Sequence, residues 1–511
     1  MKTNHRMKSP RVAGFTLMIF ALMAVPSHPI VAQSQEGQKG TIQESKKGTT
    51  DAANAVDQGA FQRKAVPAAS SETEIEQLKT RLNQLEQTAE QLKQQLATLE
   101  QARVTPGAAV GGAVSVPAAV PQPTAKPEAD TKAQLKESTF QVYGFVMLDA
   151  GYQVKTNDPL WFDVVRPTKL PSFAGEFAPN GKVYFGVRQT RFGVKSSTPT
   201  KYGELKTHFE FELFGVGAEA GETNFRLRHA YGELGQFGAG QTWSPFMDID
   251  VFPNSFEYWG PNGMVFFRNV QFRWMPLKGR NDVTIALERP GATADQGPFS
   301  GRIELQGVTP KFDLPDLSGH VRFNRDWGYF QAAGMLRRIK WVDTNNDQFD
   351  LSGKATGLGL NLSSNLKFGE NDIGKFSVVY GKGIENYMND APTDVGIART
   401  FSNDPRRPIK GVALPVLGAV AFLDHNWSKR FSSSIGYSFE NIENSDGQLA
   451  NAFHRGHYAL TNLLFYPVEN VTMGAEFQWG KRTNAHDGFS SNDYRVQFGF
   501  KYNYSKLFKT E

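Results

Sequence analysis

The stretch that most constrains the fold lies near the C-terminus, at residues 494–504. Its even positions are Tyr494, Val496, Phe498, Phe500, Tyr502 and Tyr504, and its odd positions are Arg495, Gln497, Gly499, Lys501 and Asn503. Successive side chains of a strand point to opposite faces, so this strand has one aromatic, apolar face and one polar face. A soluble sheet can share that pattern, but an aromatic face on the closing strand is typical of barrels with lipid outside and water inside.

The same alternation recurs upstream and predicts about 16 antiparallel strands. It is clear at 205–213, 225–228, 435–439 and 471–480. It is weaker at 140–154, 184–197, 237–243, 264–274, 283–288, 317–324, 329–341, 354–366, 376–384, 415–426 and 457–466.

The connections between these strands alternate in length. Short connections include 199–203, 427–430 and 467–470, and long ones include 155–182, 244–263, 289–316 and 385–414. Short turns at one end and long loops at the other are typical of a transmembrane barrel, with the turns in the periplasm. We therefore predict an all-β transmembrane barrel over residues 139–511, with both ends of the barrel on the periplasmic side.

The residues before the barrel divide into four segments. Residues 1–32 read as a signal peptide, because a positive start precedes a short apolar run; the alternative is a retained anchor helix. Residues 33–69 are polar and poor in aromatic residues, which predicts disorder. Residues 70–103 are predicted to form an α-helical coiled coil, and residues 104–138 an Ala/Pro-rich linker.

The coiled-coil prediction rests on a narrow apolar stripe. Steps of three and four residues separate Ile75, Leu78, Leu82, Leu85, Ala89, Leu92, Leu96 and Leu99. Such a helix pairs with copies of itself or with another chain. The alternative is a single helix lying on the barrel.

Composition and motifs exclude several classes of function. The chain has no cysteine, which removes disulfides, thiolate catalysis and Cys-ligated metals. The net charge is mild, 56 − 51 = +5, and no RNA-binding signature accompanies it, so no nucleic-acid partner is expected. We find no catalytic motif and predict neither an enzyme nor a cofactor. The acids near 343–350 lack the glycine and closing glutamate of a calcium loop, so no metal is predicted either.

Two blocks of sequence resemble a known family. One runs through Gly240-Gln241-Thr242-Trp243-Ser244-Pro245-Phe246 to Phe256-Glu257-Tyr258-Trp259-Gly260-Pro261, and the other is Arg188-Gln189-Thr190-Arg191-Phe192-Gly193-Val194. They are similar to the DcaP-like outer-membrane porins. The resemblance implies a homotrimeric 16-stranded porin of the Gram-negative outer membrane that admits small anions, notably dicarboxylates and aromatic acids such as phthalates.

Anion selection needs fixed positive charge in the lumen, and arginine suits carboxylates because its fork donates two parallel hydrogen bonds. Alternation predicts that Arg226, Arg228, Arg273 and Arg322 face inward. The apolar parity changes between Val187 and Phe192, which predicts a bulge that brings Arg188, Arg191 or both into the lumen. Arg268 lies at a strand end and stays ambiguous. The alternative is that acids such as Glu204, Glu210 and Glu212 neutralise these arginines.

The loop at 244–263 is the candidate constriction. Trp243, Tyr258 and Trp259 supply bulk, and Asp248, Asp250 and Glu257 supply negative charge. Acids facing arginines would create a transverse field across the pore. The alternative is a surface loop or a trimer contact.

We therefore expect a porin for passive, anion-preferring diffusion of small molecules. Two alternatives stay open: a sugar porin, and a barrel-anchored periplasmic tether that acts through the coiled coil. The expected partners are outer-membrane lipid and lipopolysaccharide, two further copies of the chain, and small anionic solutes. The coiled coil, in the periplasm, is a candidate contact to peptidoglycan or a periplasmic protein.

Overall fold

The computed structural model describes residues 137–291, 303–399 and 404–510. These residues all belong to one compact unit, Ala113–Glu511. The predicted signal peptide, disordered segment and coiled coil, and the linker up to residue 136, lie outside the described residues. None of the helices within the described ranges is long and apolar enough to cross a bilayer.

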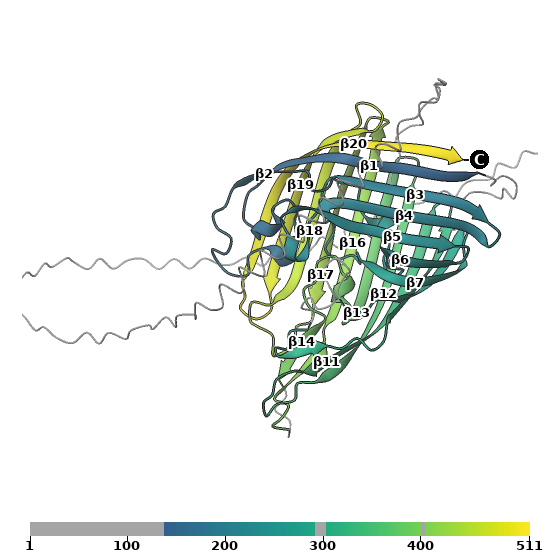
Figure 1. Cartoon of the computed structure of the whole chain (residues 1–511). Coiled ribbons are helices and arrows are strands. Elements are labelled where there is room, and N and C mark those ends of the chain that lie inside the picture. Colours follow the sequence, from purple (N-terminus) through teal and green to yellow (C-terminus); the bar gives the residue numbers. More distant parts are fainter. Residues whose placement is uncertain (1–136, 292–302, 400–403, 511) are drawn as a thin grey trace, which may run out of the picture. The chain divides into compact units, whose positions relative to one another are not determined.

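Within the described ranges, sixteen antiparallel wall strands form one closed sheet, as the alternation predicts. Figure 1 shows this sheet curving into a barrel. The strands of the first half are β1 (Ser138–Gln153), β2 (Lys182–Gly186) continued by β3 (Arg191–Thr200), β4 (Gly203–Phe214), β5 (Thr223–Leu234), β6 (Phe237–Trp243), β7 (Arg268–Leu277), β8 (Asn281–Glu288) and β10 (Asp316–Arg325). Those of the second half are β11 (Gly328–Asp343), β12 (Gly353–Phe368), β13 (Asp372–Lys382), β16 (Pro415–Ser428), β17 (Phe431–Ile442), β18 (Phe453–Phe465), β19 (Val471–Asn484) and β20 (Ser490–Thr510).

The remaining elements belong to the connections. Three short strands are β9 (Val308–Pro310), β14 (Val395–Arg399) and β15 (Ile409–Ala413). The described helices are single 3-10 turns: η1 (Pro159–Trp161), η2 (Pro167–Lys169), η3 (Gly217–Glu219), η4 (Ile249–Val251) and η5 (Glu385–Tyr387).

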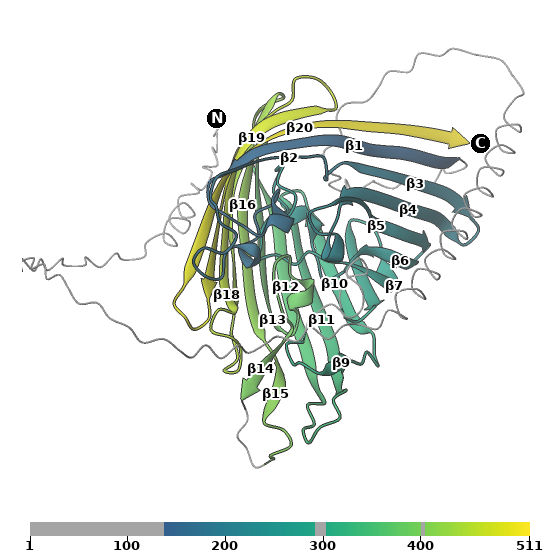
Figure 2. The same cartoon turned by 60° about the vertical axis from the view of Figure 1, so that its left-hand side comes forward.

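The first and last strands close the barrel. β1 pairs with β20 along its whole length, from Ser138 opposite Thr510 to Gln153 opposite Arg495. The other edge of β1 pairs with β2 and β3. Figures 1 and 2 both show β1 and β20 side by side. Closure leaves no open sheet edge, which is what a membrane requires of a β protein.

The predicted bulge is present between β2 and β3. Asp149 pairs with Gly186 and Phe145 pairs with Arg191, so four residues, 187–190, lie opposite three, 146–148. The extra residue shifts the outward face from odd positions at Val187 to even positions at Phe192, and both side chains are exposed. Arg188 and Arg191 therefore both point inward.

The two faces of the wall differ as the closing strand predicts. On β20, Phe498 is 58% exposed on the outer face, whereas Arg495 and Gln497 are fully buried on the inner face. Exposed aromatic side chains gather where the wall strands meet the short turns, at Tyr202, Phe237, Trp274, Trp327, Phe368 and Trp427. Such aromatic girdles mark the membrane interface of a barrel.

Long loops fill part of the lumen. We call residues 244–267, between β6 and β7, loop L3, and residues 383–414, between β13 and β16, loop L6. Phe246 and Phe267 of L3 pack with Tyr387, Met388 and Leu414 of L6 in one buried apolar cluster. The turn end of the barrel has short connections, and the loop end has the long ones that fold inward (Figure 2).

Candidate functional site in the barrel lumen

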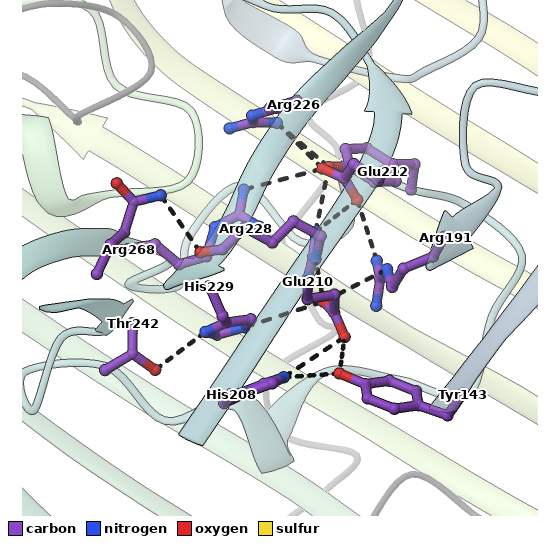
Figure 3. Close-up of polar contacts among 12 residues, drawn as sticks. Tyr143, Arg191, His208, Glu210, Glu212, Arg226, Arg228, His229, Thr242 and Arg268 are labelled. Atoms are coloured by element: carbon purple, nitrogen blue, oxygen red, sulfur yellow. Dashed lines mark hydrogen bonds and ion pairs between the residues drawn. The ribbon is translucent and has the colours of Figure 1, made fainter. Parts of the chain in front are cut away.

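Four arginines converge on two glutamates of β4 inside the barrel (Figure 3). Arg228 of β5 donates from Nε to Glu210 and from Nη1 to Glu212, each at 2.6 Å. Arg191 of β3 lies 3.2 Å from Glu212. The other two are Arg226, at 3.4 Å from Glu212, and Arg268 of β7, at 3.9 Å. We call these six residues the arginine cluster.

A second bulge, in β5, turns consecutive side chains inward. Glu210 pairs with His229 while Phe211 pairs with Leu227, so Arg228 is the extra residue on β5. The His229 ring stacks on His208 at a centroid distance of 4.4 Å, and Tyr143 of β1 donates its hydroxyl to Glu210 at 2.6 Å. The bulge thus sets an imidazole pair directly beside the arginine cluster.

The arginine cluster carries excess positive charge. Among these six residues, four guanidinium groups stand against two carboxylates, a formal balance of 4 − 2 = +2. Arg228 and Arg268 are 4% and 5% exposed. Arg191 and Arg226 keep 21% and 11% of their side-chain surface exposed. The excess charge therefore reaches the lumen mainly through Arg191 and Arg226.

A cavity of about 440 Å³ lies beside the arginine cluster, because its lining includes His208, which stacks on His229, and Thr242, which hydrogen-bonds His229 (Figure 3). Its lining includes Lys195 of β3 and Arg273 of β7. Arg273 donates to the amide oxygen of Gln271 and to the Trp243 carbonyl. Within the described ranges, neither Lys195 nor Arg273 has a carboxylate within 4.0 Å. The lining also holds two glutamates, Glu204 and Glu233, which pair with Lys206 and Lys278. Among the described residues, Lys195 and Arg273 are therefore the two cations of the cavity that form no ion pair.

We expected the acids of L3 to face arginines across the pore, and two of them instead bind one wall arginine directly. Arg322 of β10 donates to Asp248 at 2.5 Å and to Asp250 at 2.6 Å, and Asp248 also accepts from Tyr329 and Ser363. These contacts fix L3 to β10, β11 and β12. Asp248 and Asp250 are therefore paired with Arg322, an inward-facing arginine of the wall, and do not face the arginine cluster as unpaired acids.

Glu257 is also buried and hydrogen-bonded within the loops. It is 2% exposed and accepts hydrogen bonds from the backbone N–H groups of Val165 and Gly260. Burial raises the pKa of its carboxyl to about 7, although Arg495 and these N–H groups oppose the shift. This acid anchors L3 to the first long loop instead of lining an open pore.

The aromatic residues of L3 connect it to the arginine cluster and to the loop end. Tyr258 hydrogen-bonds Glu212 and stacks on Phe214 at a centroid distance of 3.9 Å. Trp259 donates from Nε1 to the Asn389 carbonyl of L6. Trp243, the last residue of β6 before L3, has its ring centroid 5.1 Å from the guanidinium carbon of Arg268. L3 thus contacts the arginine cluster through Tyr258 and L6 through Trp259, and a constricting role for this loop stays a prediction.

The six arginines predicted from the sequence therefore separate into groups. Arg191, Arg226 and Arg228 meet in the arginine cluster, Arg273 lines the cavity, and Arg322 binds L3. Arg188 is 1% exposed and binds Asp163 at 2.6 Å, away from the cavity. A selecting role for these residues stays a prediction.

Sequence reasoning missed several residues of this site. Arg268 was ambiguous because it starts its strand, and Tyr143 joins only through the pairing of β1 with β3. Lys195 and His208 had a usable signal, because each shares the inward parity of its strand. Within the described ranges no group of histidines and acids is arranged to hold a metal ion.

Comparisons with known proteins agree with this architecture. The model of the family described as DcaP outer membrane protein matches residues 93–504. The crystal structure of the outer membrane channel DcaP of Acinetobacter baumannii is similar, with a TM-score of 0.60, 20% identity, and coverage of 72% of this chain and 97% of that one. An anion-selective porin from Comamonas acidovorans has a TM-score of 0.46 and 11% identity, covering 72% and 100%. A comparison with curated proteins found no match.

Proposed function

This chain belongs to the DcaP outer membrane protein family, whose model covers residues 93–504 of its 511 residues, and from that premise we propose an anion-preferring function. The chain is an outer-membrane porin, and we propose that small anions diffuse passively through it in preference to cations. The permeants we propose are dicarboxylates and aromatic carboxylic acids.

The observation that carries this proposal is the charge of the arginine cluster. Its formal excess of 4 − 2 = +2 lies on the inner wall beside L3. Low-dielectric walls focus the field of such a charge and raise the local concentration of counter-ions. Guanidinium groups stay charged at every physiological pH and can donate two hydrogen bonds to one carboxylate.

The neighbouring cavity supports the preference for dicarboxylates and aromatic acids. Lys195 and Arg273 line one space without acidic partners in the described part of the chain, so a solute with two carboxylates can meet two cations there. Tyr231 lines the same space and lies beneath Arg273, with 5.1 Å between the guanidinium carbon and the ring centroid. Its ring offers a surface for an aromatic permeant.

A sugar porin is the alternative within transport. Sugars are held by stacking on aromatic rings, and a sugar pathway would need a continuous ladder of such rings. Among the described residues that line the cavity, Tyr231 is the single phenylalanine, tyrosine or tryptophan. Three are lysine or arginine and two, Glu204 and Glu233, are glutamate, which leaves 3 − 2 = +1. This lining favours anions over sugars.

We further propose a homotrimer, oriented with its turn end toward the periplasm. β1 begins and β20 ends at the turn end, where Ser138 lies opposite Thr510. The segment that precedes β1, with the predicted coiled coil, would then lie on the periplasmic side of the membrane. The family relationship is what supports the trimer.

The test is a competition measurement on the full-length porin in a planar bilayer. We expect a benzene dicarboxylate added in the millimolar range to block chloride current in a concentration-dependent manner, because it competes for the same cations. A neutral disaccharide at equal concentration is the matched control and should leave the current unchanged. Block by the disaccharide with none by the dicarboxylate would favour the sugar-porin alternative.

A further inference from the structure

Three lysines stand in one row on the outer face of the barrel near the loop end. Lys340 of β11 pairs directly with Lys354 of β12. On the other side, the backbone N–H of Lys311, which follows β9, donates to the Lys340 carbonyl at 2.7 Å. Trp341 is buried on the inner face and Leu336 is exposed on the outer face, so Lys340 and its two neighbours point outward.

This row is electrostatically unfavourable in the isolated chain. Residues directly opposite on paired strands have Cβ atoms about 4.5–5.5 Å apart, and like charges there repel. Arg338 of β11 and Lys382 of β13 add two more cations on the same face. We call Lys311, Arg338, Lys340, Lys354 and Lys382 the basic rim patch.

Acidic partners do not balance the basic rim patch. Across the described ranges, the one carboxylate within 4.0 Å of these five cations is Asp313, at 3.5 Å from Arg338 and 3.4 Å from Lys340. Five cations and one acid leave 5 − 1 = +4. A stable arrangement of so many like charges points to an external anion.

The position of the patch identifies the kind of anion. Leu336 and Leu358 are 48% and 55% exposed on the same two strands, two residues from Arg338 and four from Lys354. At about 3.4 Å per residue, the cations begin about 7 Å and 14 Å along the strands from the lipid-facing leucines. Tyr380, 57% exposed, lies two residues below Lys382 on β13. The patch therefore directly follows the apolar band, at the level expected for lipid headgroups.

With the orientation proposed above, which sets the loop end outside, we propose that the basic rim patch binds the phosphate groups of an anionic glycolipid, lipopolysaccharide, in the outer leaflet. Arginine and lysine are the side chains that bind phosphate, and lysine extends its ammonium along an apolar surface toward a headgroup. The acyl chains would lie on the leucines below, so one lipid contacts both bands. Bound phosphates relieve the repulsion within the row of three lysines.

The test measures lipid binding by the full-length porin in detergent, with lipopolysaccharide that carries phosphorylated lipid A and with the same material after dephosphorylation. The variant is Lys311→Gln/Lys340→Gln/Lys354→Gln. We expect its affinity for the phosphorylated lipid to fall about tenfold or more, because each cation adds to the attraction. The dephosphorylated lipid should bind wild type and variant equally weakly.

The matched control removes three charges at the turn end, in Lys201→Gln/Lys367→Gln/Lys429→Gln, and should bind like wild type. Without lipid the rim variant should unfold at the wild-type temperature or above it, because repulsion is removed. Should it fail to fold, Lys354→Glu offers a charge that pairs with Lys340 and should also weaken binding. Equal affinity of wild type and rim variant for the phosphorylated lipid, or equal affinity of wild type for both lipids, would overturn the proposal.

Discussion

Two guanidinium sites in this barrel differ in the ratio of cations to acids. In the arginine cluster four arginines share Glu210 and Glu212, whereas at L3 the single Arg322 meets both Asp248 and Asp250. Among the residues named, the first site has two more cations than acids, and the second has one more acid than cations. An inward-facing arginine can thus belong to a cation-rich cluster or hold a loop in place, according to its partners, and the strand pattern alone does not distinguish the two.

The largest effect on stability should come from removing Arg322, the arginine that holds L3. Arg322→Ala leaves Asp248, which is 3% exposed, without its cation. Breaking a buried ion pair on one side costs about 3 to 5 kcal/mol. We expect a clear fall in the thermal unfolding temperature and noisier single-channel current as L3 loosens.

Arg325→Ala, on the same strand but exposed at the turn end, is the matched control and should leave both properties unchanged. A normal unfolding temperature with quiet channels in Arg322→Ala would show that L3 does not depend on this contact.

Glu257 differs from the other two acids of L3, which pair with Arg322, because it has no ion pair within 4.0 Å in the described part of the chain. Its folded pKa of about 7 lies above the ordinary value of 4.5, so the folded protein holds the proton more tightly. The contribution of Glu257 to stability should therefore be greatest below pH 4.5 and fall as the pH rises to about 7, by on the order of 1 to 3 kcal/mol.

The measurement is the unfolding temperature of wild type and Glu257→Gln between pH 5 and 8. The amide cannot ionise, so the variant should lose this part of the pH dependence. Parallel profiles for the two proteins would contradict the assignment.

The cavity cations test whether charge without acidic partners binds solutes. Lys195→Gln with Arg273→Gln should weaken block by a benzene dicarboxylate about tenfold, since two charge-assisted hydrogen bonds are lost. The control is Lys429→Gln, an exposed turn residue that is absent from the lining of the cavity. Unaltered block in the double variant would place the solute site elsewhere.

The exposed members of the arginine cluster should have a smaller effect on ion selectivity. Arg191→Gln with Arg226→Gln brings the formal charge from +2 to 0 while leaving Arg228 to hold both glutamates. We expect the ratio of chloride to potassium permeability to fall a few-fold toward one. A ratio equal to that of wild type would mean that the cluster is structural.

Breaking an exposed ion pair should have almost no effect on stability. Arg407 and Asp350 lie 2.6 Å apart, with 55% and 43% of their side chains exposed, and hydrogen bonds from Arg407 and Ser352 lower the pKa of Asp350 to about 2. Its contribution is present above pH 4 and is lost as the pH falls through about 2. Arg407→Ala should leave the unfolding temperature at pH 7 unchanged, because exposed pairs contribute little; a marked drop would assign the outer loops a larger part in stability.

Local pattern was enough to predict the wall of this barrel and the bulge before Arg191. Alternation has a period of two residues. The change from an odd outward position at Val187 to an even one at Phe192 therefore shows that one extra residue lies between them. The partners of the inward arginines were less accessible. Arg322 and Asp248 are 74 residues apart, and their contact depends on how L3 folds into the lumen. The convergence of Tyr143, Arg191 and Arg268 on β4 depends on the register of several strands at once.

The central claim is that surplus guanidinium charge in the lumen makes this porin prefer anions. The most direct measurement is the reversal potential of the full-length porin in a bilayer that separates two concentrations of potassium chloride. The account predicts a potential of the sign that chloride permeation produces. A potential of the opposite sign, set by potassium, would contradict it.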